Sequence, residues 1–221
     1  METKIKLNGI DAEKPSNCKE VIKKDKIENY NGSIWLEKKT FRIVLISTFS
    51  ALAVVLGYAL VSIPNVELFT LMIFLGGFIL GKRDGLIIGL LSSFIFVFFN
   101  PWGTSQLPLF TYQITHYSLT GFLGGVMQTY LKKKDSFKPK EDLYTLRLMI
   151  FFGFIGLSIT LMFDIISTLI GSLINFGFDI ELLILSYISG IPFTLAHLIG
   201  NTLGFIFILP GSISLIYKLL D

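Results

Sequence analysis

The residue of greatest chemical interest in this chain is Asp164, which stands inside a long apolar stretch. In a hydrocarbon environment an unpaired carboxylate costs several kcal/mol unless it meets a donor or takes up a proton. His197 and Asn201 stand one helical turn apart in a later apolar stretch, so their side chains share a helix face. Asp164 can therefore contact a polar ligand in a pocket, take part in proton coupling, or hydrogen-bond a neighbouring helix through Ser167, Thr168 or His197, and the residue types leave all three roles open.

Polar and small residues recur at intervals of three or four along three of the later apolar stretches, which places each series on one helix face. The three series are Gln113, His116, Thr120 and Gly124; Gly153, Thr160, Asp164, Thr168, Gly171 and Asn175; and Gly190, Thr194, His197, Asn201 and Gly204. Asp164 and His197 are expected at similar depth, which indicates a shared pocket that faces outward. For His197 and Asn201, packing and ligand contact remain equally open, and His116 is better explained by packing within the bundle.

The composition excludes an ordinary soluble domain. Of 221 residues, 52% are hydrophobic and 21 are Phe. A soluble domain of this length would need more polar residues to cover its surface. The formal net charge of +3 gives no reason to expect a nucleic-acid partner. The single cysteine, Cys18, cannot form an internal disulfide. We expect residues 1–40 to be a polar, disordered cytoplasmic tail and residues 41–221 to be a transmembrane domain embedded in the lipid bilayer.

Six apolar runs are long enough, or nearly so, to cross a hydrocarbon core of about 30 Å as helices. They cover residues 41–63, 68–81, 85–100, 107–131, 146–174 and 181–217. The last run is too long for one span and contains Gly190, Pro192 and Pro210, so we expect a short outer segment at 180–190 and a final span at 191–216. The predicted fold is all-α: a polytopic membrane protein with a bundle of six transmembrane helices.

The basic residues predict the orientation of this bundle. All Lys and Arg fall within residues 1–42, at 82–83, within 132–147 and at 218, which six spans place on one side of the membrane. The opposite loops, 64–67, 100–108 and 175–181, contain none. By the positive-inside rule both termini are cytoplasmic, in a multi-pass protein of the cell membrane.

Small residues predict where helices approach one another closely. They recur as Ser47 with Ala51, as Ala53 with Gly57, and as the series Gly85, Gly89 and Ser93. Packing within the bundle and docking of another membrane subunit both explain this spacing.

Two outer loops carry further candidate ligand contacts. One contains Asn65 and Glu67, and the other contains Asn100 and Trp102. Asn both donates and accepts hydrogen bonds. Trp102 fits either an anchor at the membrane interface or a ring that stacks on a flat ligand.

Taken together, these features resemble the substrate-specific S-components of energy-coupling-factor (ECF) transporters. The resemblance covers residues 41–216 and rests on the order and spacing of the strings IPNVELFT, GGFILGKRDGLIIGLLSSFIFVFFNPWG, GFLGG, FDIIST and GIPFTLAHLIGN. It implies a subunit that captures a vitamin or related micronutrient from outside and works with a transmembrane coupling protein and cytoplasmic ATPases. This chain differs in its long charged tail, which the compact members of the family lack.

The resemblance also implies roles for particular residues. The small-residue face of the first span would meet the coupling protein through Ser47, Ala51, Ala53 and Gly57. The substrate would lie near the outer ends of spans 4 to 6, under the first outer loop, close to Asn65, Glu67, Gln113, Asp164, His197 and Asn201, with Asn100 and Trp102 in the neighbouring loop. No cofactor or metal is implied. A desolvated carboxylate favours a donor or a positive partner, so we expect a neutral or cationic heteroaromatic substrate such as a ring vitamin or a modified-base precursor.

Two other functions remain as alternatives. Asp164 could serve as the ion or proton site of a stand-alone secondary transporter, although no internal repeat relates residues 41–130 to 146–216. An intramembrane enzyme is disfavoured, because the chain has two His, no H-E-x-x-H and no G-x-S-x-G motif. It also lacks the G-x-x-x-x-G-K-[S/T] loop, so ATP hydrolysis is expected on partner subunits.

Overall fold

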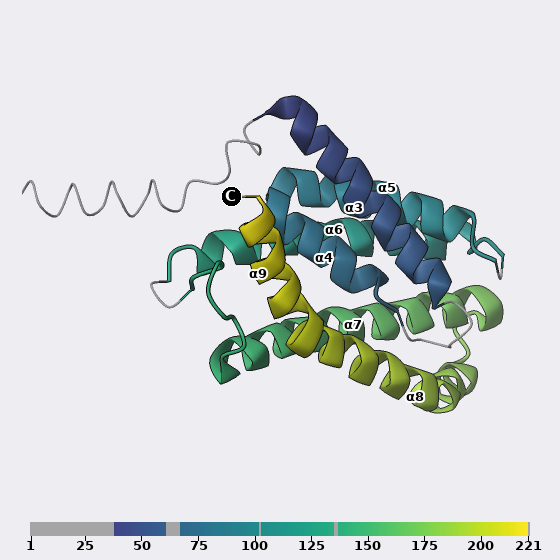
Figure 1. Ribbon diagram of the computed structural model, residues 1–221. Helices are drawn as coiled ribbons and strands as arrows, with labels where there is room; N and C mark the ends of the chain where they lie inside the picture. Colours follow the sequence, from purple (N-terminus) through teal and green to yellow (C-terminus); the bar gives the residue numbers. More distant parts are fainter. Residues whose placement is uncertain (1–37, 61–66, 102, 135–136, 221) are drawn as a thin grey trace, which may run out of the picture. The chain divides into compact units, whose positions relative to one another are not determined.

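The computed structural model describes residues 38–60, 67–101, 103–134 and 137–220. The chain divides into two units, Met1–Ser33 and Ile34–Asp221, and the described residues all belong to the second. The predicted tail at 1–40 therefore lies outside them except for its last three residues. Regular structure in the described ranges is entirely helical (Figure 1).

The helices follow the apolar runs of the sequence. They are α3 (Lys39–Ala59), α4 (Phe69–Leu80), α5 (Lys82–Phe98), α6 (Leu107–Leu131), α7 (Leu146–Phe176), α8 (Ile180–Leu203), the π-helical turn η1 (Gly204–Ile208) and α9 (Leu209–Leu219). Three helical segments are long and apolar enough to cross a membrane: Lys39–Ala59, Leu146–Phe176 and Ile180–Leu219. Helix α4 is apolar but shorter.

The expected boundary between an outer segment at 180–190 and a final span at 191–216 is not marked by an interruption of the helix. Helix α8 runs without interruption through Gly190 and Pro192, and then continues through η1 into α9. Pro192 removes one backbone donor, which would have bonded the carbonyl of Ile188, and membrane helices tolerate this loss when the rest of the hydrogen-bond ladder is intact. The irregularity lies farther along, where the amide of Leu209 donates to the carbonyl of Gly204 and opens a π turn.

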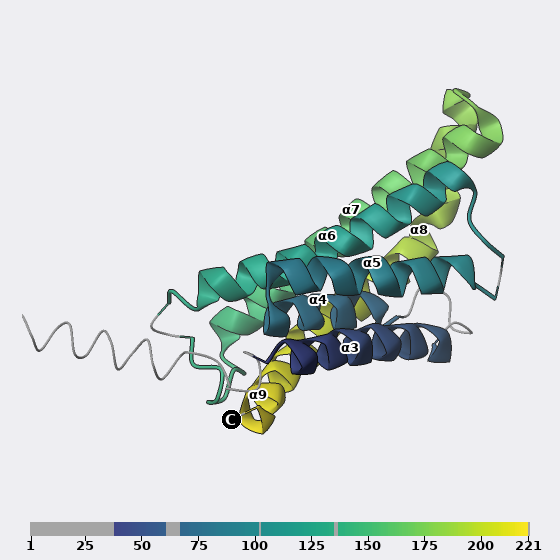
Figure 2. The ribbon, with the colours of Figure 1, turned by 90° about the horizontal axis from the view of Figure 1, so that it is seen from above.

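Helix α4 forms the centre of the bundle, and every one of its residues is buried. It contacts α3, α5, α6 and α9, which surround it in both ribbon views (Figures 1 and 2). Phe74 packs against Phe205, and Phe78 packs edge-on against Phe137 and Phe152. These rings join α4 to η1, to the loop after α6 and to α7. The position of α4 therefore determines the position of Glu67, which lies just before the helix.

Glycines bring α4, α5 and α6 into backbone contact. A Cβ added at Gly121 of α6 would collide with the backbone of Gly85 in α5, and one at Gly77 of α4 would collide with the backbone of Gly121. Gly89 stands equally close to the backbone of α6 at Tyr117. For Gly85 and Gly89 the structure therefore shows internal packing, the first of the two explanations left open by the sequence.

The small residues of α3 divide between two faces. Ala53 and Gly57 are buried, and a Cβ on Gly57 would lie 2.7 Å from the ring of Phe96. These two positions pack inside the chain, and their expected docking role stays a prediction. Ser47 and Ala51 are exposed.

We predict that Gly121→Ala destabilises the protein by about 1–3 kcal/mol, because the added methyl group meets backbone that cannot rotate away. Gly171→Ala is the matched control, since a Cβ there meets no described atom within 4 Å. Thermal unfolding in detergent, followed by circular dichroism, measures the difference. An equal effect of the two substitutions would contradict the packing described.

Candidate functional site

His197 of α8 lies between two carboxyl groups from other parts of the chain. Its Nδ1 is 2.8 Å from Oδ1 of Asp164 in α7, and its Nε2 is 3.4 Å from Oε1 of Glu67, just before α4. Asp164 and His197 are 8% and 5% exposed. Three segments far apart in the sequence are thus joined through one imidazole ring.

The geometry assigns hydrogen-bond roles within this cluster. When both carboxyl groups are ionised their oxygens only accept, so each imidazole nitrogen donates and the ring carries a positive charge. Thr70 donates a further hydrogen bond of 2.6 Å to the same oxygen of Glu67. Burial alone would raise the pKa of the Glu67 carboxyl. The hydrogen bond and charge of His197, together with the hydrogen bond of Thr70, outweigh burial, so the pKa lies below its ordinary value. The result is a charged triad of Glu67, Asp164 and His197.

A second polar contact lies one helical turn from the triad. The amide Nδ2 of Asn201 donates to Oγ1 of Thr160 over 3.1 Å, and both residues are buried. Asn201 follows His197 by four residues and Thr160 precedes Asp164 by four, so the two contacts stack along the α7–α8 interface. Within the described part of the chain, Oδ2 of Asp164 and Oδ1 of Asn201 are buried acceptors without a hydrogen-bond donor.

Two tyrosines hold the turn of α7 that carries Asp164. The hydroxyl of Tyr112 in α6 donates to the carbonyl of Met162 over 3.1 Å. The hydroxyl of Tyr187 in α8 donates to the carbonyl of Ile165 over 2.7 Å. Asp164 lies between these two carbonyls in the sequence, so its backbone is held relative to both neighbouring helices.

Aromatic rings gather around Phe163 on the α6 side of the triad. The centroids of Tyr112, His116 and Tyr117 lie 6.0, 5.1 and 5.4 Å from that of Phe163. Phe163 in turn meets His197 edge-on at 5.9 Å. The polar triad is therefore flanked by a wall of rings, which we call the aromatic wall (Tyr112, His116, Tyr117 and Phe163).

The structure brings together four of the predicted ligand residues: Glu67, Asp164, His197 and Asn201. Gln113 instead accepts a hydrogen bond of 2.9 Å from Ser105 in the preceding loop. Asn100 is half-buried in the turn after α5. Asn65 and Trp102 lie outside the described residues.

Sequence reasoning missed Phe163 and Tyr187. Phe163 directly precedes Asp164 and so belongs to a different face of an ideal helix, and nothing in the polar stripes indicates it. Tyr187 acts on a backbone carbonyl, which has no sequence signature. Among the His, Cys, Asp and Glu residues that the structure describes, no group is arranged to hold a metal ion.

We predict that His197→Leu costs about 3–5 kcal/mol of stability, because it leaves two buried carboxylates without their shared partner. His116→Leu is the control, since the described hydrogen bond of His116 joins its Nδ1 to the hydroxyl of Tyr112, over 3.4 Å, and not to a carboxyl group. Neutralising the carboxylates as well, with Glu67→Gln and Asp164→Asn, should restore part of the loss. Thermal unfolding of the four proteins in detergent tests this, and equal stability of the two histidine variants would refute the triad's role.

Comparison with known proteins bears on what this arrangement does. A search of curated proteins and a search of solved structures found no match. A family model described as "ECF transporter, substrate-specific component" matches residues 41–214, which is most of the chain and includes all four residues gathered at the site. The chain therefore belongs to the family of substrate-specific components of ECF transporters.

Proposed function

We propose that this protein captures a vitamin or related micronutrient from outside the cell and delivers it inward as the membrane-embedded binding subunit of an ECF-type importer. The observation that carries the proposal is the convergence of Glu67, Asp164, His197 and Asn201, from three segments of a chain of this family, at one buried polar position. A cluster of this kind supports binding of a small molecule, because two of its acceptors have no donor among the described residues.

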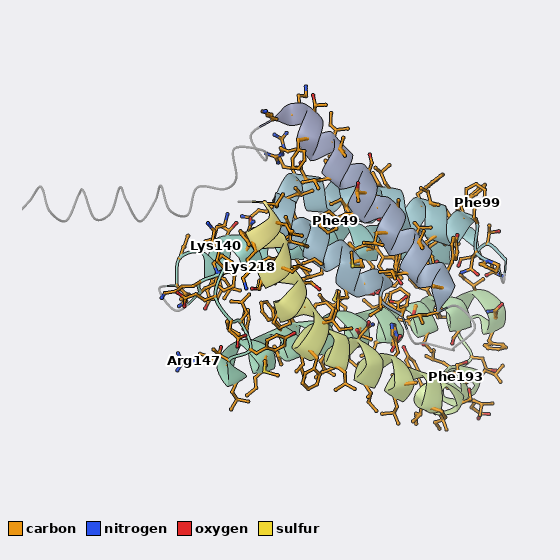
Figure 3. All side chains as sticks on the ribbon, in the orientation of Figure 1. Phe49, Phe99, Lys140, Arg147, Phe193 and Lys218 are labelled. Atoms are coloured by element: carbon orange, nitrogen blue, oxygen red, sulfur yellow. The ribbon has the colours of Figure 1, made fainter. Side chains whose placement is uncertain are left out.

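The proposed arrangement in the membrane is six spans with both termini in the cytoplasm. Its support is the segregation of charge: Lys140, Arg147 and Lys218 lie together toward one end of the helices, and Phe99 and Phe193 lie toward the other (Figure 3). Asp164 lies about 26 Å along α7 from Arg147, which corresponds to the outer half of a membrane. A site at this depth suits capture from outside.

Transport would require partners. The family match supports work with a transmembrane coupling protein and ATPase subunits, and the sequence contains no phosphate-binding loop of its own. Ser47 and Ala51 offer a small, exposed face on α3 where another helix can approach closely. We assign docking of the coupling protein to this face.

The proposal predicts that Ser47→Leu together with Ala51→Leu removes the coupling protein and ATPases from the purified complex and abolishes uptake, while the isolated subunit still binds its micronutrient. Ser158→Leu is the control, because Ser158 is a small exposed residue on α7 that bonds only its own helix at Phe154 in the described structure. Co-purification and uptake by whole cells are the readouts. Unchanged uptake in the double variant would contradict the docking assignment.

Transport assays with and without the partner subunits distinguish an importer subunit from a stand-alone secondary transporter. An importer subunit alone in proteoliposomes should move no substrate, and uptake should require ATP hydrolysis by the partners. If the isolated chain transports substrate and Asp164→Asn removes the pH dependence of that transport, the ion-coupled alternative replaces this proposal.

The topology predicts which positions react with a membrane-impermeant thiol reagent on intact cells. Cys18 of the native chain should react only after permeabilisation. In a Cys18→Ser background, Lys140→Cys should behave in the same way, whereas Thr104→Cys and Phe178→Cys should react from outside. All three substituted residues are exposed. Labelling of position 140 from outside, or protection of both 104 and 178, would overturn the six-span arrangement.

A further inference from the structure

The hydrogen-bonding capacity of the site is unbalanced toward acceptors. Oδ1 of Asp164 bonds His197, and Nδ2 of Asn201 donates to Thr160. Oδ2 of Asp164 and Oδ1 of Asn201 therefore have no donor among the described residues. Leaving a buried acceptor unpaired destabilises the protein, and a charged acceptor does so more strongly than a neutral one. A molecule that fits this site must therefore bring N–H or O–H donors.

The charge of the site is also unbalanced. One imidazolium between two carboxylates leaves one negative charge in excess. Every Lys and Arg in the described structure lies at a helix terminus or in the polar segment 132–147, remote from the middle of α7 and α8. In an apolar setting an excess negative charge favours a cation or a strongly polarised N–H and disfavours an anion.

The aromatic rings near the triad favour a flat ring. Phe163 meets His197 edge-on, and Phe163 and Tyr112 lie nearly parallel, with an interplanar angle of 24°. Both rings are partly exposed, whereas His116 and Tyr117 behind them are buried. A planar heterocycle gains from contact with aromatic faces, and a positively charged one gains more.

Building on the proposed function, we propose that the substrate is a planar nitrogen heterocycle bearing amino groups, one of which donates to Oδ2 of Asp164 while a second N–H donates to Oδ1 of Asn201. In this assignment Asp164 and Asn201 contact the substrate. His197 and Glu67 are positioning residues that hold the Asp164 carboxylate in place. Molecules that meet the site with a carboxylate or phosphate are excluded.

Three matched probes test the assignment: 2,4-diaminopyrimidine, its isostere 2,4-dimethylpyrimidine, and pyridine-2,4-dicarboxylate. Isothermal titration calorimetry on the full-length protein in detergent gives the affinity for each. We expect the diamino probe to bind at least about tenfold more tightly than the dimethyl probe, a difference of about 1.4 kcal/mol, and the dicarboxylate to bind worst. No difference between the diamino and dimethyl probes, or preference for the dicarboxylate, would overturn the proposal.

Variants locate the effect. Asp164→Asn should reduce the preference for the diamino probe at least about tenfold, and Ser158→Ala, on the exposed side of the same helix, should leave it unchanged. If Asp164→Asn unfolds, Asn201→Ala provides the second measurement, because it removes one acceptor and keeps the charged triad. If a folded variant still prefers the diamino probe over the dimethyl probe, the amino groups bind at another position, and the assignment is refuted.

The natural ligand provides an independent check. Mass spectrometry of small molecules released from the protein, purified gently from its own cells, should identify a compound with an amino-substituted ring. An acid without N–H donors would refute this inference and leave the importer role standing. Absence of any ATPase-bearing complex would instead count against the proposed function, so the two failures are distinguishable.

Discussion

The placement of an imidazolium between two buried carboxylates is the constraint on which this structure depends. Neither Asp164 nor Glu67 is tolerable as an isolated charge in an apolar bundle, so α7 and the start of α4 must both come within reach of His197 on α8. Since lipid offers helices little hydrophobic reason to associate, this electrostatic contact together with close glycine packing determines their relative positions. The same contact leaves Oδ2 of Asp164 without a donor in the described part of the chain, which is the basis for the proposed binding of a donor-bearing substrate.

Positioning of the triad begins far from it. Glu67 precedes α4, and α4 is fixed by rings from η1 and α7 and by backbone contact with α6 at Gly77. At the other end of α4, Arg42 of α3 bonds Asp84 of α5 at 2.9 and 2.5 Å and reaches the carbonyl of Leu80. These contacts among the first helices set the position of Glu67 relative to the α7–α8 pair.

Much of this could be predicted from the sequence, because apolar length and helical periodicity are local properties. Each of the six apolar runs is mostly helical in the part that the structure describes. Asp164 meets His197, and Asn201 meets Thr160 one helical turn away. Pro192 does not interrupt α8, because a helix in an apolar phase retains its hydrogen-bond ladder through one missing donor. The inward burial of Ala53 depends on which neighbour faces α3, and the tyrosine bonds to α7 involve backbone carbonyls, so neither follows from side-chain periodicity.

The most direct test of the account is a high-resolution cryo-EM structure of the complex purified from its own cells. We expect density for a small planar molecule within hydrogen-bond distance of Oδ2 of Asp164, in a chain bound to a coupling protein and ATPases. A chain in which other protein groups satisfy both Asp164 and Asn201, with no molecule beside them, would contradict it. In that case the triad would be a structural tie between helices and not part of a substrate site.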